Sequence, residues 1–66
     1  MTDAEIRILI YPRQFAEAWF RLLSQHKTYE SAYEALETEY VNYFGRRKYS
    51  DYNSFRNVKD RIFKAK

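Results

Sequence analysis

Residues 28–45 read TYESAYEALETEYVNYFG, the longest helical pattern in the chain. Thr28 suits the N-cap of a helix, and Glu30 suits its first turn, where the helix dipole favours negative charge. Gly45 follows the last apolar residue, where a left-handed glycine commonly ends a helix. Between these limits one face collects the apolar residues at helical spacing: Tyr29, Ala32, Tyr33, Leu36, Tyr40, Tyr43 and Phe44. The stretch predicts a helix over residues 29–44.

The same helix carries two further sets of side chains. Four tyrosines share its apolar face, and we expect all of them in the core rather than in a base-stacking platform: Tyr29, Tyr33, Tyr40 and Tyr43. Three carboxylates form an acidic stripe: Glu30, Glu34 and Glu37. Without a histidine they make a poor metal site, so we expect a solvated face, turned away from any polyanion.

Two further helices are predicted on either side. Pro12 suits the first helical position, and an apolar face follows through Phe15, Trp19, Leu22, Leu23 and His26, which predicts a helix over about 12–26. Ser50 can cap a last helix, with Asp51 in its first turn. Its apolar face contains Tyr52, Phe55, Val58, Ile62 and Phe63, which predicts a helix over about 51–64. Short connections between the three favour an all-α, compact three-helix domain that is helix-turn-helix-like.

Residues 1–11 fit two descriptions. Thr2 and Glu5 have the spacing of a capping box, which predicts a short helix beginning at Asp3. Ile6, Ile8 and Ile10 alternate as in a strand, but a lone strand has no partner in this chain. We therefore expect a short helix or an extended N-terminal arm, within a single domain spanning residues 1–66.

Composition narrows the class of protein. The chain has 66 residues, no cysteine, one histidine and seven tyrosines, five phenylalanines and one tryptophan. A domain this small has a thin stability margin and must fold on aromatic packing, to which a second copy of the chain could add. We expect no metal, no cofactor and no catalytic residues. No segment reads as a signal peptide or membrane span, so we expect a soluble, cytoplasmic protein.

Positive charge is concentrated near the C-terminus. Residues 46–66 contain eight basic residues: Arg46, Arg47, Lys48, Arg56, Lys59, Arg61, Lys64 and Lys66. Only Asp51 and Asp60 oppose them, whereas residues 1–45 are net acidic. Such a separation gives the molecule one positive end, which favours a polyanionic partner.

Residue types divide this basic segment into candidate contacts. Arg46, Arg47 and Lys48 precede the N-terminal end of the last helix, where cations and backbone N–H groups suit a phosphate. Asparagine and arginine can bind base edges, so the base-facing candidates are Asn53, Arg56 and Asn57. Lys59, Arg61 and Lys64 further along would contact phosphates. Tyr49 and Tyr52 are candidates for stacking or for an interface.

The sequence Tyr49-Ser50-Asp51, followed by Phe55 and Val58, resembles the recognition helix of AraC-type helix-turn-helix regulators. The resemblance covers residues 49–58. That family places its glycine directly before the aromatic residue, whereas Gly45 stands four residues earlier, and its domain holds two such units. The resemblance implies that Asn53, Arg56 and Asn57 lie on a base-facing helix.

The sequence therefore predicts a nucleic-acid-binding protein, for duplex DNA in preference to RNA. Its size suits an accessory protein of a phage or mobile element. One alternative is a protein-interaction module or small inhibitor, with the basic C-terminal helix docked on an acidic partner protein. Another is a structural subunit whose aromatic surface serves oligomerisation, for instance as a homodimer.

Overall fold

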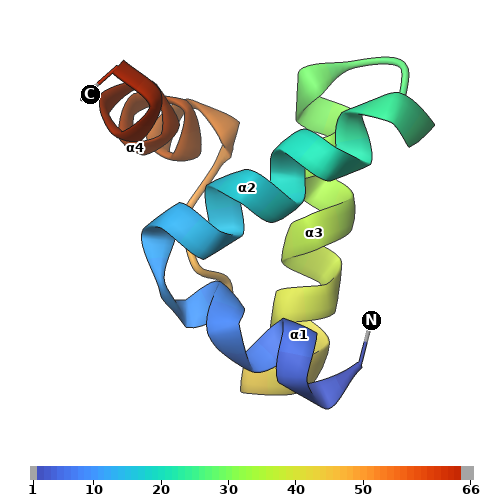
Figure 1. Ribbon diagram of the computed structural model, residues 1–66. Coiled ribbons are helices and arrows are strands. Elements are labelled where there is room, and N and C mark those ends of the chain that lie inside the picture. The colour runs from blue at the N-terminus through green and yellow to red at the C-terminus, as the bar shows by residue number, and fades with distance from the viewer. Residues whose placement is uncertain (1, 65–66) are drawn as a thin grey trace.

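The computed structural model describes residues 2–64; Met1, Ala65 and Lys66, the last counted in the basic segment, lie outside it. The chain forms α1 (Asp3–Arg7), the 3₁₀ turn η1 (Ile8–Ile10), α2 (Pro12–Leu22), the 3₁₀ turn η2 (Leu23–Gln25), α3 (Tyr29–Phe44) and α4 (Tyr52–Lys64). Helix α2 crosses α3 and also packs against α4, while α1 lies beside the C-terminal end of α3 (Figure 1). The predicted all-α domain is confirmed, and residues 2–64 contain no strand.

The N-terminal segment is a short helix rather than an extended arm. The Thr2 N–H donates to Glu5 Oε1 at 2.8 Å and the Glu5 N–H donates to Thr2 Oγ1 at 3.3 Å, which completes the capping box. Ile6 and Leu9, three residues apart, are buried, whereas Ile8 and Ile10 are exposed. The strand-like alternation of isoleucines was therefore misleading, because burial follows the helical spacing.

Helix α2 supplies the centre of the core. It begins with Pro12 as predicted, and η2 continues it to Gln25. Phe15 is fully buried. Its ring lies 5.4–6.3 Å from those of Tyr33, Tyr40, Tyr49 and Phe55, all in edge-on arrangements. Such pairs each contribute about 0.5–1.5 kcal/mol beyond the area they bury, so one side chain ties together α2, α3, α4 and the segment before α4.

Helix α3 has the predicted bounds and caps. Thr28 Oγ1 accepts the Ser31 N–H at 3.0 Å, and Gly45 has a left-handed φ of 83°. Tyr33 and Tyr40 are buried as predicted. Tyr29 and Tyr43 are not: they are 59% and 39% exposed. Both lie in the end turns of α3.

Helix α4 begins one residue later than predicted. Asp51, rather than Ser50, caps it, because Asp51 Oδ1 accepts the Ser54 N–H at 2.9 Å. The Ser50 hydroxyl instead shares a 3.0 Å hydrogen bond with the Ser54 hydroxyl. The predicted apolar face is correct: Phe55 is fully buried, and half-buried side chains extend it at Tyr52, Val58, Ile62 and Phe63. Residues 45–51 connect α3 to α4, a longer connection than the usual helix-turn-helix turn.

Candidate nucleic-acid interface

The outer face of α4 is free of packing. Its six side chains are all exposed: Asn53, Arg56, Asn57, Asp60, Arg61 and Lys64. They occupy the side of the helix opposite Phe55, which is held against Phe15 and Trp19 of α2. Because one 13-residue helix carries all six, the candidate base-facing residues and two of the candidate phosphate ligands share one surface.

The one acidic residue on this face is partly neutralised. Lys59 Nζ lies 2.6 Å from Asp60 Oδ1, and this hydrogen bond lowers the pKa of the Asp60 carboxyl. The outer face therefore keeps the charges of Arg56, Arg61 and Lys64.

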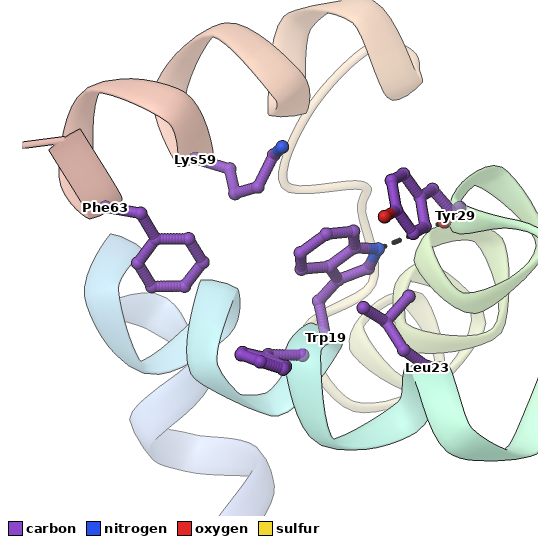
Figure 2. Close-up of a pocket in the computed structure, with 6 residues that line it drawn as sticks. Trp19, Leu23, Tyr29, Lys59 and Phe63 are labelled. Atoms are coloured by element: carbon purple, nitrogen blue, oxygen red, sulfur yellow. Dashed lines mark hydrogen bonds between the residues drawn. The ribbon is translucent and has the colours of Figure 1, made fainter.

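Lys59 itself does not lie with these cations. Its side chain is only 14% exposed, and its ammonium sits 5.1 Å from the centre of the Trp19 ring. Figure 2 shows it above the indole, whose Nε1 donates to the Tyr29 carbonyl at 3.0 Å. Cation–π contact explains this position. This position does not favour the expected contact of Lys59 with a phosphate, because its ammonium faces the aromatic side of α4.

The segment before α4 lies along α3, and two of its three cations, Arg47 and Lys48, bind groups of the protein itself. Arg47 donates from Nη1 to Glu34 Oε1 at 3.3 Å, from Nη2 to the Tyr33 hydroxyl at 3.1 Å, and from Nε to the Tyr49 carbonyl at 3.0 Å. The hydrogen bonds to Glu34 raise the pKa of the Arg47 guanidinium above its usual range. Arg47 thus fastens the connection to α3 and has few donors left for a phosphate.

Lys48 is also directed inward. Its Nζ donates to the Ile10 carbonyl at 2.6 Å and lies 5.6 Å from the ring centres of both Tyr40 and Tyr49. Burial lowers the pKa of its ammonium, and the nearby charge of Glu37 opposes that effect. Of the three cations in this turn, Arg46 alone is exposed without a hydrogen bond or ion pair to another described side chain.

Glu37 contradicts the predicted solvated stripe. It is 1% exposed. Its carboxylate accepts three hydrogen bonds, from the Tyr33 hydroxyl at 2.6 Å and from the N–H groups of Lys48 and Tyr49 at 3.0 and 2.9 Å. The burial of Glu37 could have been predicted from its position, since it follows Tyr33 by one turn and lies beside Leu36 on the buried face.

Acidic side chains surround the N-terminal end of α4, where the sequence predicted a phosphate. Asp51 accepts one of its free N–H groups. Asp51 and Glu30 line the same hollow of about 230 Å³, together with Tyr52 and Asn53. Two carboxylates there oppose an incoming phosphate, so the predicted phosphate site at this helix end is not supported by the local charge.

Tyr49 and Tyr52 are half-buried against the core. The Tyr49 ring lies 5.5 Å from that of Phe15, and the Tyr52 ring lies 5.9 Å from that of Tyr33. Burial raises the pKa of the Tyr49 hydroxyl. Only part of each ring remains for stacking with a partner.

Neither comparison with known proteins nor a search of the described residues for membrane helices and metal sites points to a function. Comparison with protein-family models gives no match, and searches of curated proteins and of solved structures find no significant similarity. Within residues 2–64, no helix has the length and apolar character to cross a membrane. In the same range, no three histidine, cysteine, aspartate or glutamate side chains are grouped as metal ligands.

Proposed function

We propose that the protein binds duplex DNA through the outer face of α4. The observation that supports this most is the exposure of Arg56, Arg61 and Lys64 beside Asn53 and Asn57 on one helix. The cations can neutralise phosphates, and the amides with Arg56 can reach base edges. Arg47 and Lys48 are not among the proposed phosphate ligands, because both side chains are bound within the fold.

A single helix with a free polar face suits the major groove of B-form DNA, which admits an α-helix. The deep, narrow major groove of an RNA duplex does not admit side chains in this way. Asn53, Arg56 and Asn57 lie in the N-terminal half of α4, the part that reaches bases in helix-turn-helix proteins. Arg61 and Lys64 would then lie over the backbone.

The test is a titration of fluorescently labelled duplex DNA from low to physiological salt. The double variant Arg61→Ala/Lys64→Ala should lose affinity on the order of tenfold at low salt. A matched control removes two exposed cations elsewhere, Arg7→Ala/Lys27→Ala, and should bind as the parent does. Absence of binding at low salt, or equal losses in both double variants, would rule the proposal out.

The same cationic face would also fit an acidic protein, the alternative function. Capture of an acidic partner that depends on Arg61 and Lys64, without retention on immobilised DNA, would replace the DNA proposal with that one. A cytoplasmic accessory role in a phage or mobile element depends on the DNA proposal, and failure of DNA binding would remove it as well.

A further inference from the structure

The outward side of α2 carries a bulky aromatic ring among polar residues. Phe20 is 60% exposed, and its neighbours on that side are Glu17, Arg21 and Ser24. Its ring packs edge-on against Phe63 of α4, with the ring centres 6.3 Å apart and the planes at 65°. An exposed apolar group with a polar rim is typical of an interaction surface.

This aromatic pair lies between two hollows. One, of about 530 Å³, is lined by Glu17, Phe20, Arg21 and Phe63. The other, of about 270 Å³, is lined by Trp19, Phe20, Leu23, Tyr29, Lys59 and Phe63. Figure 2 shows the second hollow, with Phe63 and Lys59 of α4 opposite Trp19 and Leu23. A projecting ring and the space to receive one therefore adjoin on the same surface.

Charge on this surface is also self-complementary. Glu17 and Arg21 are one turn apart and line the same hollow. Glu17 has a weak tie to Arg13, at 4.0 Å with both side chains well exposed, and Arg21 makes no ion pair with a described residue. Two copies of α2 can pack antiparallel through their outward sides, with a two-fold axis that crosses the helix at the level of residue 19. Each Glu17 then lies opposite the other copy's Arg21.

We propose that a second copy of this chain docks here, so that the protein forms a two-fold dimer through α2 and Phe63. Each Phe20 ring enters the larger hollow of the other copy, the one lined by Glu17, Phe20, Arg21 and Phe63, and two Glu17–Arg21 pairs close the rim. A two-fold interface must present the same patch on both subunits, and this surface holds both a ring and its receptor, and both signs of charge. The outer face of α4 remains free in this dimer, so the inference does not depend on DNA binding.

The experiment measures the mass in solution by sedimentation equilibrium over a range of protein concentrations. The parent should dimerise with rising concentration. Phe20→Asp should raise the dissociation constant by at least about tenfold, because a buried aromatic anchor is lost twice per dimer. Tyr11→Asp is the matched control: Tyr11 is 63% exposed and precedes α2, where aspartate suits the N-cap. It should dimerise as the parent does.

A charge exchange tests the geometry without altering the aromatic pair. Glu17→Arg alone and Arg21→Glu alone should each weaken the dimer, since like charges then meet across the axis. A mixture of these two variants should form a heterodimer more tightly than either variant pairs with itself. A parent that stays monomeric at all concentrations, Phe20→Asp that dimerises normally, loss of dimer in Tyr11→Asp, or no gain on mixing would overturn the proposal.

Discussion

The Tyr33 hydroxyl donates a 2.6 Å hydrogen bond to the Glu37 carboxylate one turn further along α3, and both side chains are almost completely buried. The same carboxylate accepts the backbone N–H groups of Lys48 and Tyr49. Glu37 is therefore the acceptor that fixes the path from α3 to α4. No buried side-chain polar atom among the described residues lacks a partner, which is what a stable buried carboxylate requires.

We expect Glu37→Gln to destabilise the fold. The amide has one acceptor oxygen where the carboxylate has two, so a donor is left unpaired at a cost of about 1–3 kcal/mol in the free energy of unfolding. Glu37→Ala should cost more, about 3–5 kcal/mol, because all three donors lose their acceptor, and this is a large fraction of the stability of a small domain. Urea unfolding measures both, with Glu39→Gln as the control on the same helix. A stable Glu37→Ala protein would contradict this role.

Stability should fall at high pH. Burial, together with the hydrogen bond to Glu37, raises the pKa of the Tyr33 hydroxyl well above its usual value near about 10. The unfolded state therefore loses this proton first, and the free energy of unfolding decreases above about pH 10, by up to about 1.4 kcal/mol per pH unit. Below that pH the contribution is complete.

Tyr33→Phe isolates this effect. It removes one group whose pKa is raised, so the decline above about pH 10 should be shallower than in the parent. The lowered pKa of Lys48 acts in the opposite sense and is common to both proteins. Thermal unfolding from neutral pH to about pH 11.5 compares the slopes. Parallel curves for the two proteins would show that Tyr33 does not cause the decline.

Gly45 should be hard to replace. Its φ of 83° lies in the left-handed region, and a Cβ added at this position would meet no atom within 4 Å, so the penalty is conformational rather than steric crowding. Gly45→Ala should lower the free energy of unfolding by about 1–2 kcal/mol, and Gly45→Asn by less, since asparagine tolerates this conformation better. Equal stability of all three proteins in urea would argue against the left-handed C-cap.

The salt dependence of DNA affinity should distinguish the exposed cations Arg61 and Lys64 from Arg47, which is bound within the fold. With three phosphate contacts, from Arg46, Arg61 and Lys64, the slope of log affinity for DNA against log salt should be roughly −3, and Arg61→Ala/Lys64→Ala should reduce its magnitude by about 2. Arg47→Ala should leave the slope unchanged and instead lower the free energy of unfolding by about 0.5–1.5 kcal/mol. A changed slope in Arg47→Ala would return Arg47 to the set of phosphate ligands.

The helices could be read from the sequence because their signals are local. The Thr28 cap, Gly45 and Pro12 each act on backbone groups within one turn, and the two faces of α4 follow from helical spacing. The predictions that failed depended on distant neighbours or on the detailed geometry of a turn. Ser50 was one position from the true cap, and only the structure shows that Asp51 receives the Ser54 N–H.

The residues exposed on the candidate interface were predicted only in part. The exposed set on α4, including Asn53, Arg56 and Asn57, follows from its spacing, since those residues oppose Phe55. Phe20 was not assigned to the predicted apolar face, and only the structure shows that it is exposed and packs against α4. Its surroundings, including Phe63, come from a different helix far along the chain.

The sequence alone determined the α-helical class, the limits of α3 and the concentration of positive charge after Gly45, because these depend on adjacent residues. The tertiary structure decided which of these basic side chains are bound within the fold and which are exposed. Arg47 meets Glu34 across thirteen positions, and Lys48 reaches Ile10 across thirty-eight. Such pairs form only when the connection folds back along α3, so the packed chain holds Arg47, Lys48 and Lys59 against the protein and leaves Arg46, Arg56, Arg61 and Lys64 exposed without an ion pair to a described residue.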